Sequence, residues 1–157
     1  MNKVVTYHAA EIAKYFIHIA NRESKHITNK KLQKLLYYAQ AWSVTARQKP
    51  LFRDKIEAWV HGPAIRSVYL KYKSFGFAQI LQVVAESELS KITIDDKKFL
   101  DEVCTVYGKF DSSYLEQLTH SEKPWLDARE GLEAHVGSEN EITHVSMEEF
   151  YATLLKQ

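Results

Sequence analysis

Histidine, cysteine and carboxylate side chains are the groups in this sequence that could do chemistry, but their spacing forms no familiar site. Seven histidines are scattered along the chain, and no two form the i, i+4 pair that places two zinc ligands on one helical face. A single cysteine, Cys104, is too few for a thiolate zinc site. The sequence contains no glycine-rich phosphate loop and no Gly-x-Ser-x-Gly nucleophile motif. We therefore expect no metal, no cofactor and no enzymatic activity.

Three single residues are the remaining candidates for a reactive or special polar role. Cys104 is expected in the middle of a helix near the edge of its buried stripe, where a small packed residue is a better interpretation than a thiol nucleophile. His120 is interpreted as a side chain that anchors its connector by hydrogen bonds, in preference to a catalytic base. Glu57 is a possible acid beside Trp59, but we expect it to be a half-exposed strand residue.

The charged residues are distributed unevenly, although the formal net charge of the chain is only +1. Residues 1–79 contain 14 Lys/Arg and 4 Asp/Glu, a balance of +10, whereas residues 80–157 contain 7 Lys/Arg and 16 Asp/Glu, a balance of −9. Two interpretations are open. Either the halves fold against each other and their fields largely cancel, which we favour, or the basic half attracts an acidic protein or nucleic acid.

The basic half also interleaves basic and aromatic residues, a combination that can grip phosphates and stack on bases. These residues are Lys30, Lys31, Lys34, Tyr37 and Tyr38 on one expected helix, and Arg66, Tyr69, Lys71, Tyr72 and Lys73 on another. No helix-turn-helix, zinc-finger or RNA-recognition signature accompanies them. A nucleic-acid-binding module therefore stays an alternative function, and we do not expect nucleic acid to be the main partner.

Helical spacing of apolar residues predicts the two N-terminal elements. The first helix is expected over about residues 7–23, with Thr6 as its N-cap. Thr28 is expected to cap a second helix that runs to about Arg47, because Pro50 disfavours helical geometry in the residue before it.

The pattern changes after the second helix. Residues 56–60 alternate and are rich in β-formers, which predicts a short strand. The next residues, 61–63, are interpreted as a turn, with Pro63 at the start of a third helix that ends near Gly76. Residues 77–94 fit either a short strand or a buried helical turn.

A further helix is expected to open at Asp95 or Asp96 and to end at Gly108, with Val103 and Val106 facing inward. A short helix follows, starting at Ser112 or Ser113 and ending near Leu118.

Residues 119–125 are interpreted as a connector that leads into a helix through Arg129. Residues 141–145 predict a small strand, and Ser146 with Glu149 forms a capping box for the last helix.

These elements predict a mainly α fold, a compact single-domain helical bundle of about six helices with minor short β-strands. No repeat, low-complexity tract or linker divides the chain, so residues 1–157 are expected to form one domain. The longest apolar runs are too short for a membrane span. The N-terminus does not read as a signal peptide, and a lone cysteine favours a reducing compartment, so we expect a cytoplasmic protein.

The second helix carries the most specific hint of an interface. Its leucines fall on one stripe, whereas Lys30, Tyr37 and Val44 project nearly opposite, with Lys34 beside them. Either this helix is central and covered on both sides, or Tyr37 belongs to a docking patch, because tyrosine is enriched at protein interfaces. We favour the central helix.

Several strings in this order resemble the Panacea domain of SocA-like antitoxins and their phage-associated relatives. The first is KLQKLLYYAQAW over residues 31–42, and the order and spacing continue across roughly residues 8–130. The later strings are Pro50-Leu51-Phe52, Ile56-Glu57-Ala58-Trp59, His61-Gly62-Pro63, Val68-Tyr69 with Tyr72 and Gly76, Val106-Tyr107-Gly108, Leu118-Thr119-His120, Pro124-Trp125 and Ala128-Arg129.

The resemblance implies the antitoxin of a toxin–antitoxin pair, which neutralises a cognate protein toxin by direct binding and in some members delivers it to a Clp-type protease. The family supplies no catalytic residues to carry over. An alternative is a prophage or mobile-element protein that binds a host factor. The polar residues that packing explains least are our candidates for partner contact: Lys30, Gln33, Lys34, Tyr37, Gln40 and His120.

Overall fold

The computed structural model describes residues 7–156, and its mainly helical architecture confirms the predicted fold class. Seven α-helices and one three-stranded sheet occur in that range, against about six helices expected. The helices are α1 (Ala9–Arg22), α2 (Asn29–Ala46), α3 (Arg66–Tyr72), α4 (Ile94–Tyr107), α5 (Ser112–Ser121), α6 (Lys123–Ala128) and α7 (His144–Leu155). The strands are β1 (Ile56–Trp59), β2 (Gly62–Ala64) and β3 (Glu141–Ile142), and two 3-10 turns are η1 (Lys73–Phe75) and η2 (Glu86–Leu89).

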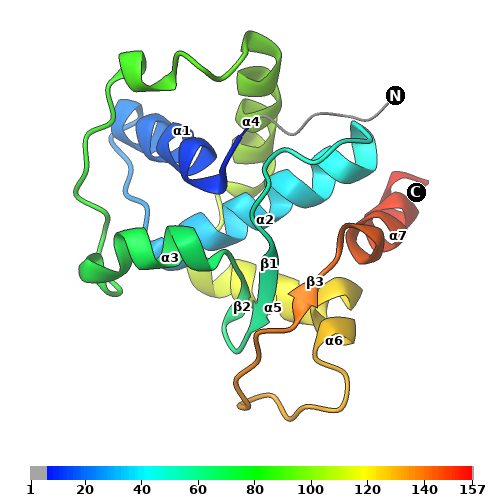
Figure 1. The fold of residues 1–157 in the computed structure, drawn as a ribbon. Helices are drawn as coiled ribbons and strands as arrows, with labels where there is room; N and C mark the ends of the chain where they lie inside the picture. The colour runs from blue at the N-terminus through cyan, green and yellow to red at the C-terminus, as the bar shows by residue number, and fades with distance from the viewer. Residues whose placement is uncertain (1–6, 157) are drawn as a thin grey trace.

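Helix α2 crosses the middle of the molecule, with α1 and α3 on one side of it and α7 on the other (Figure 1). Of its 18 residues, 14 are buried, including both Tyr37 and Val44 on the face opposite the leucines. The central-helix interpretation is therefore confirmed. Thr28 caps this helix as expected, because its side chain accepts a hydrogen bond from the backbone N–H of Lys31.

The start of α1 differs from the prediction. The helix begins at Ala9 rather than residue 7, and the predicted cap, Thr6, lies outside the described residues. His8 occupies the N-cap position without a side-chain cap. Instead, the Asp54 carboxylate accepts a hydrogen bond from the Ala9 N–H at 2.8 Å, so the cap is supplied from 45 residues away.

The sheet overturns the interpretation of Pro63 as the start of a helix. Strands β1 and β2 form a tight antiparallel pair in which Pro63 lies opposite Ala58, and α3 begins only at Arg66. Proline is tolerated here because β2 is an edge strand in the order β2-β1-β3. The predicted Gly76 terminus is confirmed: Gly76 follows η1 with a φ of 57°, the left-handed geometry that glycine adopts most easily.

Three predicted starts and ends in the C-terminal half are wrong by a few residues. Helix α4 is capped by Thr93, two residues before Asp95, and α7 is capped by Thr143 instead of a box at Ser146. Helix α5 starts at Ser112 as predicted but continues to Ser121, so most of the expected connector is helical. The sequence offers several polar residues that could cap α4 and α7, and in both helices an earlier threonine takes that position. Helix α5 instead continues for one more turn.

Two predicted burials are also wrong. Val106 is 53% exposed, because the inward face of α4 passes through Leu100, Val103 and Tyr107. Glu57 is 3% exposed instead of half-exposed. Its carboxylate accepts hydrogen bonds from the Trp59 ring at 2.8 Å and from the Arg66 guanidinium at 3.0 Å, which satisfy it inside the fold.

Candidate functional site

Five of the six candidate contact residues lie on α2, and the structure divides them into buried and accessible groups. Gln33, Lys34, Tyr37 and Gln40 are each at most 3% exposed. Lys30 keeps 29% of its side chain exposed, and His120, on α5, is half-buried. The buried four make contacts within the chain, and a role for them in partner contact stays a prediction.

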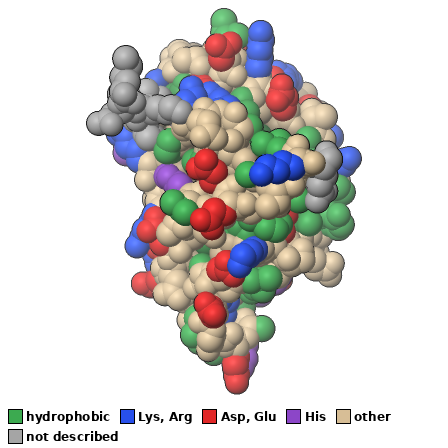
Figure 2. All heavy atoms as spheres, turned by 90° about the vertical axis from the view of Figure 1, so that its right-hand side faces the viewer, with side chains coloured by type: hydrophobic (Ala, Val, Ile, Leu, Met, Phe, Trp, Pro, Cys, Tyr) green, Lys and Arg blue, Asp and Glu red, His purple; other side chains and the backbone are tan. Residues whose placement is uncertain are grey.

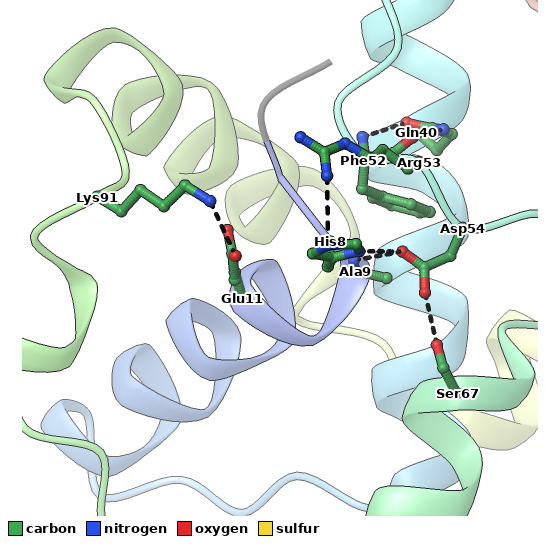
Figure 3. A network of polar contacts seen from close by, with 9 residues as sticks. All are labelled: His8, Ala9, Glu11, Gln40, Phe52, Arg53, Asp54, Ser67 and Lys91. Carbon is green, nitrogen blue, oxygen red and sulfur yellow. Dashed lines mark hydrogen bonds and ion pairs between the residues drawn. The ribbon is translucent and has the colours of Figure 1, made fainter.

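Gln40 holds the chain that leaves α2. Its side-chain oxygen accepts hydrogen bonds from the backbone N–H groups of Leu51 at 2.7 Å and Phe52 at 3.2 Å, and its nitrogen donates to the Phe52 carbonyl at 2.9 Å. Figure 3 shows the contact of Gln40 with Phe52, near Asp54, which links Ala9 to the Ser67 hydroxyl. Gln40 therefore satisfies buried backbone groups that water cannot reach.

Gln33 likewise forms a hydrogen bond to a buried backbone group, in the segment before α3. Its side-chain oxygen accepts a hydrogen bond from the Ile65 N–H at 2.7 Å, and its nitrogen donates to the Asn29 side chain at 3.0 Å. Asn29 in turn donates to the Tyr69 carbonyl at 3.1 Å. Asn29 and Gln33 thus join the N-terminal end of α2 to the first turn of α3, at Ile65 and Tyr69.

Lys34 is the least expected buried residue, because its side chain is only 2% exposed. Its ammonium group donates to the Pro63 carbonyl at 3.3 Å. The pKa of Lys34 is lowered to about 7, mainly by burial; the charge of Glu116 opposes this shift and the charge of Lys30 adds to it. Gly62 has a φ of 112°, and a Cβ there would lie 2.5 Å from Cε of Lys34. The strand passes directly over this lysine, and only glycine leaves it room.

Tyr37 belongs to a buried polar chain that reaches α7. The Tyr151 hydroxyl lies 2.9 Å from the Tyr37 hydroxyl and 2.9 Å from Oε1 of Glu122, which also accepts from the Tyr38 hydroxyl at 2.7 Å. Burial raises the pKa of Glu122, and the two tyrosine hydrogen bonds oppose that shift. The cluster fastens α7 and the α5–α6 junction to the central helix.

Lys30 and His120 meet at an accessible group that we call the α5 polar cluster, formed by Lys30, His61, Glu116 and His120. The Glu116 carboxylate lies 2.6 Å from the Lys30 ammonium and 3.3 Å from Nδ1 of His61. Burial alone would raise the pKa of Glu116, but the hydrogen bond and charge of Lys30, together with His61 and His120, lower it. The cluster lies beside Lys34 and carries more potential cations than anions.

His120 has a buried ring nitrogen. Its ring stacks on Trp125 at 3.9 Å between centroids, and its Nε2 is buried without a hydrogen-bond partner among the described residues. Burial lowers the pKa of His120, Glu116 opposes this, and Lys34, Arg129 and His61 lower it further. A neutral imidazole is therefore favoured, and it offers one free hydrogen-bonding position.

His61 and Glu116 were missed in the sequence analysis as candidate site residues. Glu116 lies four residues before His120 on α5, a spacing that places both on one helical face and would have identified it. His61 had no such signal, because only the hairpin between β1 and β2 brings it to Glu116.

The described residues contain no group of three or more His, Cys, Asp or Glu that could hold a metal ion. Cys104 is half-buried, and burial raises the pKa of its thiol to about 12, with Asp101 and Glu23 adding to the shift. The thiol is therefore protonated at neutral pH, which makes it a poor nucleophile. None of the helices within residues 7–156 has the length and apolar character needed to cross a bilayer.

The two oppositely charged halves pair with each other. Four cations of the first half form ion pairs with acids of the second: Lys14–Glu88, Lys30–Glu116, Arg47–Asp96 and Arg66–Glu139. On the face that includes α7, acidic, basic and hydrophobic side chains are interspersed (Figure 2). Tyr37, Tyr38 and Tyr72, three of the tyrosines proposed for base stacking, are buried. These observations favour cancellation of the fields over a nucleic-acid surface.

Together, the fold and these contacts define a mainly helical domain whose central helix uses its polar side chains to hold the surrounding backbone. The chain belongs to the family of SocA-like antitoxins with a Panacea domain, whose family model matches residues 32–126, more than half of its length. The match confirms the resemblance found in the sequence and extends from α2 into α6. No curated protein and no solved structure matches the chain.

Proposed function

We propose that this protein is an antitoxin that neutralises a cognate protein toxin by binding it directly in the cytoplasm. Membership of the SocA-like antitoxin family is the observation that carries the proposal. The internal hydrogen bonds of Gln33, Lys34 and Gln40 give these polar residues of the central helix a structural role. Partner binding is then a property of the outer surface.

The α5 polar cluster is our candidate for part of that surface. Lys30 is partly exposed there, and His61 is largely exposed. The partly exposed Lys30 ammonium suits an acidic side chain of the toxin. Charged contacts at the rim of an interface mainly affect the association rate, so we expect a modest contribution to affinity.

Co-expression with the protein encoded by the neighbouring reading frame tests the proposal. We expect growth to be rescued and the two purified proteins to co-elute as a stoichiometric complex with suppressed toxin activity. A complex that leaves the toxin fully active would contradict neutralisation. Absence of a complex together with capture of a host protein would favour the mobile-element alternative.

A Lys30→Glu/His61→Glu variant tests the place of contact. We expect toxin association to slow about tenfold, because charges that steer encounter mainly change the association rate. Lys91→Glu is the matched control, since Lys91 is also an exposed lysine paired with a glutamate. Equal association rates for both variants would place the toxin elsewhere without contradicting neutralisation.

Delivery of the bound toxin to a Clp-type protease is a further form of the same proposal. We expect the half-life of the toxin in cells to shorten when the antitoxin is present, and to recover when the protease is deleted. An unchanged half-life in both strains would leave occlusion as the mechanism.

A further inference from the structure

The segment between α3 and α4 contains the three most exposed large hydrophobic side chains of the described residues. Phe77 is 92% exposed, Leu81 79% and Val83 84%. The twelve residues between Lys73 and Glu86 carry no charge, although charged residues make up 26% of the sequence. Exposed apolar residues grouped in this way mark an interaction surface more often than scattered ones do.

The side-chain exposure of residues 80–84 alternates as it does along a β-strand, next to the isolated bridge of Gln79, although these residues belong to no strand of the sheet. Ile80 and Val84 are buried and Gln82 is half-buried, whereas Leu81 and Val83 point to solvent. The Ile80 N–H donates to the Ile27 carbonyl at 2.9 Å, and Gln79 forms an isolated antiparallel bridge with Thr28. At the other end, the Val84 N–H donates to the Asn21 side chain at 3.1 Å. One side of this segment is therefore attached to the molecule.

The other side of the segment is open. Main-chain polar groups of successive strand residues point in opposite directions, so those of Leu81 and Val83 point away from the edge that Ile80 and Val84 use. Within the described residues no hydrogen bond engages the main chain of Leu81 or Val83. Figure 1 shows this segment on the outer side of α1, between η1 and η2. An unpaired edge with apolar side chains is a template for strand addition.

We propose that residues 80–84 pair antiparallel with the same residues of a second copy of this chain, forming a twofold dimer centred on Gln82. In this register Leu81 of one copy lies opposite Val83 of the other, so each copy uses both of its outward-facing main-chain positions and four hydrogen bonds form. The outward side chains of the two copies then form one apolar group.

The absence of charge is the reason for choosing a second copy as the occupant. A twofold axis brings the segment of one copy against the same segment of the other, so charged residues in it would meet like charges. This segment contains no charged residue, so no such repulsion arises. The pairing brings together Leu81 and Val83 of both copies, which are 79% and 84% exposed in the single chain.

Light scattering after size-exclusion chromatography tests the dimer. We expect the purified chain to have twice its monomer mass of 18.2 kDa, and a Leu81→Lys/Val83→Lys variant to have half the mass of the wild type. Val145→Lys is the control, because Val145 is an equally apolar residue, 65% exposed on α7, and should leave the dimer intact. A wild type that stays monomeric, or a double-lysine variant that stays dimeric, overturns the proposal. If the segment instead binds the toxin, the wild type alone stays monomeric, which also overturns it.

Cross-linking tests the register without disturbing the apolar side chains. In a Cys104→Ser background, Gln82→Cys should form a disulfide-linked dimer on mild oxidation, because residue 82 meets itself on the twofold axis at a Cα distance of about 4.5 Å. Gln79→Cys should not, because its two copies lie about 20 Å apart at 3.4 Å per residue. Equal cross-linking of both variants, or none by Gln82→Cys in a dimeric sample, overturns the strand pairing.

Discussion

Gly62 and Lys34 depend on each other at the point where β2 passes over α2. The close approach of 2.5 Å between a Cβ at residue 62 and Cε of Lys34, and the 3.1 Å approach to Oγ1 of Thr119, leave no space for a side chain. The φ of 112° adds strain for any other residue.

Gly62→Ala is therefore expected to lower the free energy of unfolding by about 2–4 kcal/mol, the sum of backbone strain and overpacking. Urea denaturation followed by circular dichroism measures the change. Gly137→Ala is the matched control, because a Cβ at Gly137 meets no heavy atom within 4 Å. Equal stability of the two variants would show that β2 can move off Lys34.

Lys34 also makes stability depend on pH. Its pKa falls from 10.5 in the unfolded chain to about 7 in the fold, so the unfolded state binds more protons between these values and stability rises with pH across that window. Lys34→Met removes this effect. Relative to the variant, we expect the wild type to gain about 2 kcal/mol between pH 7 and pH 9. Parallel stability profiles for the two proteins would contradict a buried, deprotonating lysine.

At the scale of elements, two polar contacts hold α7 to the central helix: the Tyr151 hydroxyl lies 2.9 Å from the Tyr37 hydroxyl, and Nε2 of His144 lies 3.3 Å from Nε2 of Gln40. The helix lies beyond the residues matched by the family model. Its buried residues are Met147 and Tyr151, and the Tyr151 hydroxyl reaches Glu122 and Tyr37. Removal of that hydroxyl leaves the buried Glu122 with one donor fewer while the apolar packing of the ring is kept.

Tyr151→Phe is expected to cost about 1–3 kcal/mol of unfolding free energy, because a buried acceptor loses a partner. Tyr114→Phe serves as the control, since Tyr114 is 46% exposed. Urea titrations of both variants give the comparison. A loss in Tyr114→Phe as large as that in Tyr151→Phe would mean that the Glu122 cluster contributes nothing specific.

At the scale of the whole molecule, cations of the basic half form ion pairs with carboxylates of the acidic half. The Arg47–Asp96 pair is the most buried of the links between halves, with 19% and 10% of the two side chains exposed. Asp96 also accepts a hydrogen bond from the Tyr7 hydroxyl at 2.7 Å. Basic residues of the first half therefore pair with acidic residues of the second half, and this pairing leaves less positive charge open to phosphate groups.

We accordingly expect duplex DNA to bind more weakly than a Kd of about 0.1 mM at physiological salt, the weak limit of ordinary non-specific binding. Fluorescence anisotropy with a labelled duplex at several salt concentrations measures this. Micromolar affinity that falls steeply with added salt would instead support the nucleic-acid-binding module.

The sequence by itself determined the helical class, the extent of α2 and its Thr28 cap, because these follow from apolar periodicity and from caps three residues away. Only the tertiary structure decided which polar residues of α2 are buried. Helical periodicity gives the direction in which a side chain points, but it does not show which other elements pack against that face. Lys34 is covered because a hairpin folds over it, and α1 begins where Asp54 caps it from another segment. Pro63 entered a strand for the same reason: pairing with Ala58 outweighed its local preference for a helix start.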